Sequence, residues 1–401
     1  MIRLVNSTQS YAWGSRTAIP GLFGLEPSVD PVAELWLGAH VSAPSLAQAA
    51  ENVRLDDLIA ADSRAALGED VQARFGSALP YLLKLIAAES PLSLQVHPHI
   101  DRARSGYAEE DASGVPLDAA HRNFKDRNHK PELVYALTQF EALCGFRAPR
   151  RAAELFAGLD APLAKELSGV LRAQPTAEGI RAAFTQLLEP ESRPNAAAIH
   201  EVAAACAARL AVGSPSPRAD RTVVMLNQAY PGDPGVVTSL LLNPVTLQPG
   251  DAMFVPAGGV HAYLSGLGVE VMASSDNVLR AGLTPKHVDV VELLRNVDYV
   301  AAPPIRIAPE TFHGATKVFY APVDDFELSV TTLPDAAGAD ETHPLPGRGP
   351  RIVLCLEGEM TLGTSDGTLL TLSVGQSAFV PASDGRLTVC GSGTLVQADV
   401  P

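Results

Sequence analysis

The stretch Leu247-Gln-Pro-Gly-Asp-Ala-Met-Phe-Val-Pro-Ala257 decides the fold, because a second copy of it occurs later in the chain. The later copy, Leu372-Ser-Val-Gly-Gln-Ser-Ala-Phe-Val-Pro-Ala382, repeats the glycine, the apolar run and the proline at the same spacing. Each copy predicts a glycine turn, a short strand and a proline-bounded turn. Since a repeated unit indicates a repeated architecture, the sequence predicts two related β-barrels.

The segments around these copies predict the domain organisation. Short apolar runs broken by Gly, Pro and Asn predict strands up to residue 147, and strand-like runs return at 222–226 and 236–242. Between them, Ala, Leu, Arg and Glu at helical spacing predict helices at 150–171, 176–188 and 195–212. We therefore expect a catalytic barrel from residues 1–148 and 219–300, a helical insertion at 149–218, and a C-terminal barrel at 301–401. A short helix is expected at 285–297.

Length and charge exclude several classes of partner. A chain of 401 residues is long enough for two to three domains with buried cores. Its formal charge of -15 is unfavourable for nucleic acids and anionic membranes, so we expect neither as a partner. The four cysteines are far apart and no apolar leader opens the sequence, which favours a cytoplasmic location. We expect a monomer.

The first copy continues into a motif that can hold a metal. Gly250-x5-Pro256-x-Gly258-x2-His261 has the spacing of the second signature motif of the cupin superfamily, although Ser265 stands where that motif ends in Asn. This pattern predicts a histidine directed into the barrel. The second copy has no such histidine, so we expect no metal site of this kind in the C-terminal barrel.

A second cluster of ligand-type side chains lies upstream. Gln95, His97 and His99 occupy positions i, i+2 and i+4, which share one face of a strand. Imidazole nitrogens, a carboxylate and an amide oxygen suit Zn²⁺, and Mn²⁺, Fe²⁺ or Co²⁺ also fit. A single histidine of this kind is more often structural, but the two clusters together favour a metal site.

Five blocks of sequence resemble the type I mannose-6-phosphate isomerases, in order along the chain. The blocks are Tyr11-Ala-Trp-Gly14, Ala33-Glu-Leu-Trp-Leu-Gly38, Pro91-Leu-Ser-Leu-Gln-Val-His-Pro98, Asn128-His-Lys-Pro-Glu132 and the run 269–286. The resemblance implies cupin barrels with a helical insertion, dependence on zinc, and interconversion of mannose 6-phosphate and fructose 6-phosphate. It also implies a place in mannose metabolism and GDP-mannose supply.

The resemblance implies a set of metal ligands. Gln95, His97, Glu132 and His261 stand at the positions where the family holds zinc. His99 is the rival to Gln95, because a generic cupin would use both histidines of an H-x-H pair.

The resemblance also implies acid/base residues, because enediol chemistry needs proton transfer and stabilisation of oxyanion charge. Lys130 and Glu270 are the candidates for proton transfer between C1 and C2, and His129 and Asp276 are the candidates for ring opening. The alternative for both acidic residues is a salt bridge to Arg280 or Lys286. Arg280 is expected to act in catalysis and to bind the substrate.

Further candidates would bind the phosphosugar. They are Lys84, Ser93, Tyr263, Arg280 and Lys286. The chain has only six lysines among its 30 basic residues, and three of the six, Lys84, Lys130 and Lys286, lie in the segments already named. Such placement is compatible with proton chemistry or with compact phosphate binding.

Two other functions compete with the isomerase hypothesis. A non-catalytic cupin could bind a metal and a sugar phosphate without turning it over. A cupin dioxygenase would need a site of two histidines and one carboxylate with open positions, which Gln95 fits less well.

Gly363-Thr-Ser-Asp-Gly367 matches a hydrolase motif, but flanking strands predict a hairpin there instead.

Overall fold

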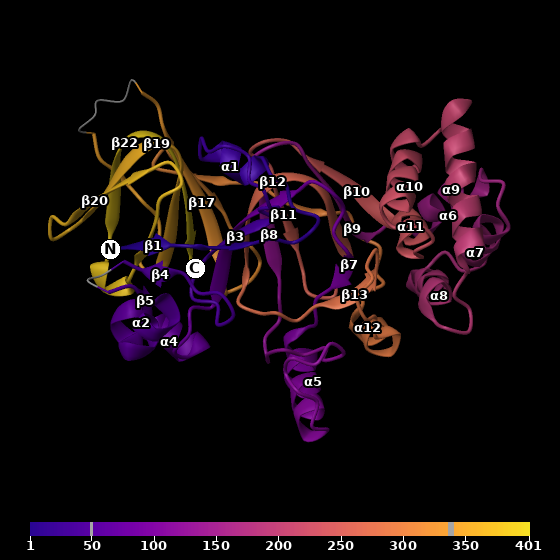
Figure 1. Ribbon diagram of the computed structural model, residues 1–401, viewed down its shortest axis with the longest axis horizontal. Helices are drawn as coiled ribbons and strands as arrows, with labels where there is room; N and C mark the ends of the chain where they lie inside the picture. The colour runs from indigo at the N-terminus through magenta and orange to yellow at the C-terminus, as the bar shows by residue number, and fades with distance from the viewer. Residues whose placement is uncertain (49–50, 336–340) are drawn as a thin grey trace.

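The chain forms two β-barrels and a bundle of helices arranged side by side along the long axis of the molecule (Figure 1). The structure is a computed structural model that describes residues 1–48, 51–335 and 341–401. The first barrel lies in the middle, the C-terminal barrel on the left and the helices on the right. The expected fold class is confirmed: the chain is mainly β, with antiparallel barrels and a block of helices.

Strand β12 (His261–Ala273) organises the first barrel, because it pairs with β6, β7, β8 and β9. The strands around it are β2 (Ser7–Gln9), β3 (Glu34–Leu37), β6 (Tyr81–Ala88), β7 (Leu94–Val96), β8 (Glu132–Ala136), β9 (Phe140–Phe146), β10 (Leu242–Leu247), β11 (Ala252–Val255), β13 (Leu279–Gly282) and β14 (Ile305–Ile307). All these pairings are antiparallel. They join strands from distant parts of the sequence, such as β8 with β11 and β7 with β13.

The C-terminal barrel takes strands from both ends of the chain. Its strands are β1 (Ile2–Val5), β4 (Leu46–Ala47), β5 (Val53–Arg54), β15 (Glu310–Phe312), β16 (Thr316–Phe319), β17 (Glu327–Leu333), β18 (His343–Pro344), β19 (Arg351–Thr364), β20 (Leu369–Ser373), β21 (Ser377–Val380) and β22 (Leu387–Asp399). The barrels therefore differ from the expected division at residue 300. Strands β1, β4 and β5 belong to the C-terminal sheet, and β14 belongs to the first barrel. Antiparallel pairing of Ile2 with Phe379 holds the N-terminal strand there.

The helices form a bundle beside the first barrel, and shorter helices lie along both barrels. Those of the bundle are α6 (Pro149–Ala157), α7 (Pro162–Ala173), α8 (Ala177–Leu188), α9 (Ala196–Ala211), α10 (Pro217–Ala229), α11 (Gly235–Thr238) and the 3-10 turn Ser239–Leu241. The others are α1 (Ala18–Leu22), α2 (Leu55–Ala61), α3 (Ser63–Leu67), α4 (Glu69–Phe75), α5 (Ile100–Ala112), α12 (Val290–Asn296) and the turn Ala382–Asp384. Among these, α2 and α3 lie next to β4, β5 and the turn Ala382–Asp384 of the C-terminal barrel. None of the helices in the described ranges has the length and apolarity needed to cross a bilayer.

The strands expected at 222–226 and 236–242 are wrong, because the bundle stays helical up to Leu241. Pro217 starts α10 at a position where proline suits a helix, and Ala219, Val223 and Leu226 are buried on one helical face. Packing of that face outweighs the strand preference of the β-branched residues. The expected helix 150–171 is also divided, into α6 and α7.

The repeated stretch has the same conformation in both barrels. Gly250 and Gly375 have φ values of 94° and 80°, which side chains other than glycine rarely adopt. Each glycine turn leads into a fully buried four-residue strand, β11 or β21. The sequence echo is therefore a structural repeat, as predicted.

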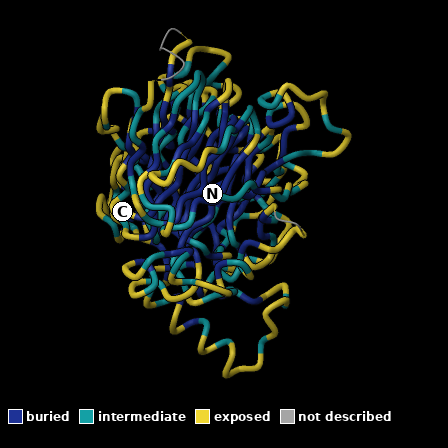
Figure 2. Tube along the Cα trace, turned by 90° about the vertical axis from the view of Figure 1, so that its left-hand side faces the viewer, coloured by how far each residue is buried: buried dark blue, intermediate teal, exposed yellow. Residues whose placement is uncertain are grey.

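One hydrophobic core runs through both barrels. It contains Leu133, Phe254 and Val271 of the first barrel together with Phe319 and Phe326 of the C-terminal barrel. Figure 2 shows the buried segments, in dark blue, along the strands inside the molecule and the exposed segments on the surrounding loops. The two barrels therefore hold each other at a defined relative position.

Candidate metal centre and active site

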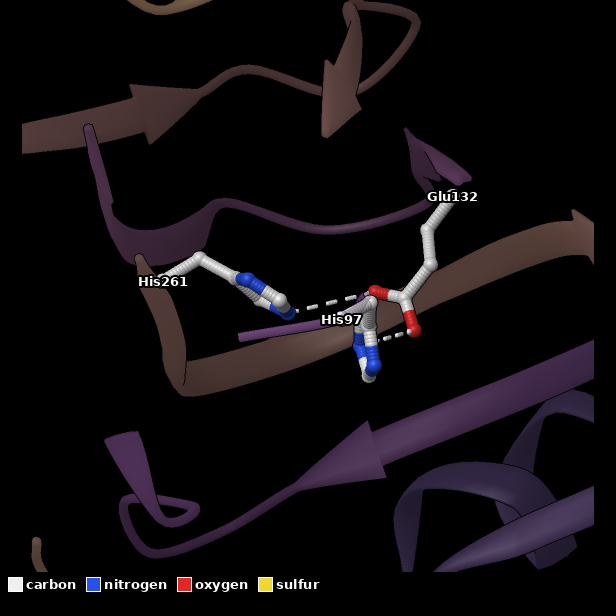
Figure 3. A group of neighbouring side chains, drawn as sticks. All are labelled: His97, Glu132 and His261. Carbon is white, nitrogen blue, oxygen red and sulfur yellow. Dashed lines mark ion pairs between the residues drawn. The ribbon is translucent and has the colours of Figure 1, made fainter. Parts of the chain in front are cut away.

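His97, Glu132 and His261 come together inside the first barrel (Figure 3). Oε1 of Glu132 lies 3.1 Å from Nε2 of His97, and Oε2 lies 3.4 Å from Nε2 of His261. One potential ligand atom from each residue lies within 4.8 Å of the other two. All three side chains are at most 2% exposed.

The sheet registers bring these three residues to the same place. Glu132 begins β8 and pairs with Val255 at the end of β11, while His261 begins β12 opposite Gln95 of β7. Between β11 and β12 the chain turns at Gly258, whose φ of 78° favours glycine and whose N–H donates to the carbonyl of His97 over 2.8 Å. The turn predicted from the motif therefore positions His261.

Hydrogen bonds orient both imidazoles toward the carboxylate. Nδ1 of His97 donates to the carbonyl of Asn277 over 2.7 Å, and Nδ1 of His261 donates to the carbonyl of Gly259 over 3.0 Å. Each Nε2 therefore carries the lone pair, as in a metal-ligating histidine. Nε2 of His97 is buried and has no hydrogen-bond partner among the described residues, so these residues fit a metal ion.

The charge states also suit a cation. Burial lowers the pKa of His97 to about 4, which leaves its imidazole neutral near neutral pH. Burial by itself would raise the pKa of Glu132, but the two histidines and Lys130 outweigh burial and hold this pKa well below its usual range. The neutral imidazole of His97 and the carboxylate of Glu132 therefore suit a divalent ion.

Gln95 reaches this centre, whereas His99 does not belong to it. Nε2 of the Gln95 amide lies 3.2 Å from Nε2 of His261, and a half-turn of the amide would present its oxygen there instead. Strand β7 ends at Val96, so the expected common face of a strand does not extend to His99. His99 is exposed and precedes α5, and its ring packs against the turn at Gly258.

A buried ion cluster lies on the neighbouring strands. Nζ of Lys84 lies 3.3 Å from Glu270 and 3.9 Å from Glu34, and it stands over the ring of Trp36 at 5.0 Å. The pairing of β6 with β12 places Lys84 directly opposite Glu270. Glu270 therefore faces Lys84, not Arg280 or Lys286 as the salt-bridge alternative had it.

The pKa values of Glu270 and Lys84 are shifted by their buried surroundings and by each other. Burial raises the pKa of Glu270 to about 7, with a further contribution from Glu132 and an opposing one from Lys84. Burial would lower the pKa of Lys84, but Glu34 and Glu270 outweigh it and raise this pKa above its usual value. Glu270 is thus able to exchange a proton near neutral pH, whereas Lys84 stays a cation.

Of the remaining candidates, Lys130 and Tyr263 contact Glu132, whereas His129 and Asp276 have other partners. Nζ of Lys130 is 3.7 Å from Oε1 of Glu132, and the phenol of Tyr263 donates to Oε2 of Glu132 over 3.2 Å. Asp276 is 42% exposed, and its carboxylate lies 3.5 Å from Nε2 of His40. His129 instead contacts Asp325 of the C-terminal barrel, at 3.1 Å.

The basic candidates for phosphate binding lie toward the surface. Arg280 is half-buried on β13 and pairs in register with Gln95, while Lys286 is exposed. Burial lowers the pKa of both groups, and Arg280 lowers that of Lys286 further. Neither side chain forms an ion pair within the described part of the chain, so both remain available to an anion. Ser93 is half-buried just before β7.

Some residues at the site were not singled out from the sequence. Glu34 and Trp36 share one face of β3 and lie within the block Ala33–Gly38 that resembles the family. The alternation of side chains along that strand could therefore have indicated that both face the site. Asn277 also lies in a quoted block, and its carbonyl orients His97. His40 lies two residues after the block that ends at Gly38, whereas Asp325 lies in a different barrel and carries no signal in the sequence.

The fold and the site define a two-barrel cupin protein with a candidate metal centre of two histidines, a glutamate and a glutamine. A family model for the catalytic domain of type I phosphomannose isomerase matches residues 1–149, and a model for the cupin domain of mannose-6-phosphate isomerase matches residues 315–400. The chain belongs to the type I phosphomannose isomerase family.

Similar proteins cover the whole chain. Mannose-6-phosphate isomerase of Escherichia coli K12 is 42% identical over 99% of both chains, and mannose-6-phosphate isomerase 1 of Arabidopsis thaliana is 32% identical over 95% of this chain and 89% of its own. A zinc-bound crystal structure of mannose 6-phosphate isomerase superposes with a TM-score of 0.87 at 40% identity, covering 99% of this chain and 98% of the other.

Proposed function

We propose that this chain is a zinc-dependent mannose-6-phosphate isomerase that interconverts D-mannose 6-phosphate and D-fructose 6-phosphate. The observation that carries the proposal is the cluster His97, Glu132 and His261 beside the buried pair of Lys84 and Glu270. Family membership and the zinc-bound relatives support the same substrate and metal.

The residues of the centre would act on different parts of the reaction. His97, Glu132 and His261, with Gln95, would hold the zinc ion. A bound zinc ion supplies Lewis acidity that polarises the sugar oxygens and stabilises developing negative charge.

The isomerisation moves one proton from C2 to C1 and one from the C2 hydroxyl to the C1 oxygen, so atoms balance through an enediol. Glu270 and Lys130 remain our candidates for moving the carbon-bound proton, because both lie beside the cluster. His129 and Asp276 remain our candidates for ring opening. Lys84, Ser93, Tyr263, Arg280 and Lys286 would bind the phosphosugar, with Arg280 and Lys286 as the cations for its phosphate.

Metal analysis with a coupled assay for fructose 6-phosphate tests this function. We expect about one zinc ion per chain, activity that is lost on chelation, and recovery when zinc is restored. His261→Ala should lose both zinc and activity, whereas the matched variant His99→Ala should keep its zinc.

Three results would contradict these assignments. Full activity of metal-free protein would overturn the metal mechanism, and full activity of His261→Ala would overturn the ligand assignment. A protein that binds zinc and mannose 6-phosphate but forms no fructose 6-phosphate would be the alternative, a non-catalytic cupin.

We also propose that the protein is a cytoplasmic monomer. Cys144, Cys206 and Cys355 are buried free thiols, which supports a reducing compartment. Size-exclusion chromatography with light scattering tests the monomer, and a mass of two chains would contradict it.

A further inference from the structure

His129 joins the loop before the metal ligand Glu132 to the C-terminal barrel. Its Nε2 lies 3.1 Å from each carboxylate oxygen of Asp325. The carboxylate is only 6% exposed, and the imidazole is 24% exposed. The contact therefore links one barrel to the other three residues before Glu132.

Both partners of this contact are held firmly. Asp325 directly precedes Phe326, which is fully buried in the core that the two barrels share. On the other side, the backbone N–H of His129 donates to the side chain of Asn128, and the carbonyl of Asn128 accepts from Nδ2 of Asn277 over 2.8 Å.

Asn277 also connects this loop to the metal centre. The carbonyl of Asn277 accepts the hydrogen bond from Nδ1 of His97. A displacement of the loop that carries His129 would therefore disturb the orientation of His97. The position of His129 is set jointly by the centre and by the C-terminal barrel.

The contact determines which nitrogen of His129 carries the proton. A carboxylate only accepts hydrogen bonds, so Nε2 must be the protonated nitrogen. In the neutral imidazole the lone pair then lies on Nδ1. No described residue forms a hydrogen bond with Nδ1, and the imidazole as a whole is partly open to solvent.

We propose that Asp325 is a positioning residue for the isomerase: it binds Nε2–H of His129 and thereby makes Nδ1 the base that opens the sugar ring. The inference rests on the proposed function and adds to it a role for the C-terminal barrel. The geometry is that of a carboxylate that orients a histidine base and stabilises its charged form.

Ring opening by Nδ1 of His129 conserves both the proton and the electron pairs. Nδ1 takes the proton of the C1 hydroxyl. The bond between C1 and this hydroxyl oxygen becomes a double bond, and the bond between C1 and the ring oxygen breaks. The ring oxygen keeps the electron pair of that bond and receives the proton back from Nδ1. The product is the open-chain aldehyde that the isomerisation requires.

Steady-state kinetics of Asp325→Asn test the proposal. Asparagine preserves the shape but loses the charge, so we expect kcat to fall by about 10- to 100-fold. KM should change little, because Asp325 does not touch the substrate. The matched control is Asp324→Asn, one residue earlier and exposed, which should behave like the unchanged protein. An Asp325→Asn variant within twofold of this control would overturn the proposal.

A double-mutant cycle with His129→Asn shows whether the effect passes through the histidine. His129→Asn alone should cost about 100-fold in kcat. In that background Asp325→Asn should have no further effect, because the two residues act as one unit. Two losses that add independently would contradict the proposal.

Nitrogen-15 NMR of the unchanged, histidine-labelled protein gives a test that needs no stable Asp325 variant. At about pH 8 the signal that disappears in His129→Asn should show a protonated Nε2 and an unprotonated Nδ1. An Nδ1–H form, or a doubly protonated ring, in the unchanged protein would overturn the proposal.

These outcomes differ from a failure of the proposed function itself. If the unchanged protein does not isomerise mannose 6-phosphate, the proposed function fails. If it does so and the variant or the NMR pattern disagrees, only the role of Asp325 fails.

Discussion

Buried charges occur in both barrels, and the candidate metal centre lies in the first. Lys84 and Glu270 are 5% and 3% exposed in the first barrel, and Arg351 and Asp399 are 0% and 1% exposed in the C-terminal barrel. Lys84 and Glu270 neutralise each other at 3.3 Å. Oδ2 of Asp399 and Nε of Arg351 instead have no hydrogen-bond partner among the described residues, so the charged form of Asp399 is poorly stabilised.

Asp399 should make the stability of the C-terminal barrel depend on pH. Burial raises its pKa to about 7 from an ordinary value of 3.8, against the opposing charge of Arg351. Between these two values the folded protein binds a proton that the unfolded chain has released, so this contribution to stability declines as the pH rises. Asp399→Asn is neutral throughout. Its melting temperature relative to the unchanged protein should therefore increase from pH 5 to pH 8.

The effect corresponds to a few kcal/mol, since one pKa unit is worth ~1.4 kcal/mol. Scanning calorimetry at several pH values measures it. The control is Asp366→Asn in the exposed hairpin of the same barrel, where hydrogen bonds from Thr364 and Thr368 lower the pKa to about 2. That control should show no trend above pH 5, and a flat difference for Asp399→Asn would refute the prediction.

Single residues at the site were partly predictable from the sequence. His97, Glu132 and His261 meet as expected. The spacing of strands and turns indicated the two histidines, and the family resemblance indicated Glu132. The contact of His129 with Asp325 was not predictable, because the two residues are 196 positions apart.

Among the elements, α5 tests how close packing competes with helix propensity. Gly106 lies in its middle, and a Cβ there would lie 2.3 Å from the ring of Phe124. Gly106→Ala should therefore lower the stability, although alanine is favoured over glycine in helices by ~1 kcal/mol. We expect a lower urea midpoint.

Gly169 of α7 is the matched control. It is exposed, and a Cβ there would meet no atom within 4 Å. Gly169→Ala should therefore raise the stability by about 0.5–1 kcal/mol. Equal effects of the two substitutions would mean that packing around Gly106 does not decide the sign.

The elements also show where local pattern was insufficient. The run 222–226 has the β-branched residues of a strand, yet it lies in α10 with Val223 and Leu226 facing the core of the bundle. The repeat of β11 and β21 was predictable, because a glycine with positive φ and a proline fix both ends of the strand locally.

At the scale of the whole molecule, the shared core should couple the unfolding of the two barrels. Phe319 of β16 contacts Tyr135 of β8 edge to face, with ring centroids 5.3 Å apart. Phe319→Ala should cost about 3–5 kcal/mol. Because the cavity would lie between the barrels, hydrogen exchange should accelerate in β6 as well as in β19.

Leu369→Ala is the control for this prediction. Leu369 is 70% exposed on β20, so its truncation should leave exchange in both barrels nearly unchanged. Faster exchange in β19 alone after Phe319→Ala would show that the barrels unfold independently.

The sequence by itself determined the mainly β fold and the repeated turn and strand, because these depend on residue types at short spacing. The set of candidate ligands followed from the resemblance to a known family. Only the tertiary structure decided that β1 joins the C-terminal sheet, that the bundle stays helical to Leu241, and that Asp325 meets His129. Those outcomes depend on which apolar faces pack together and which distant strands pair. That free energy is shared by residues far apart in the chain, so no local pattern reports it.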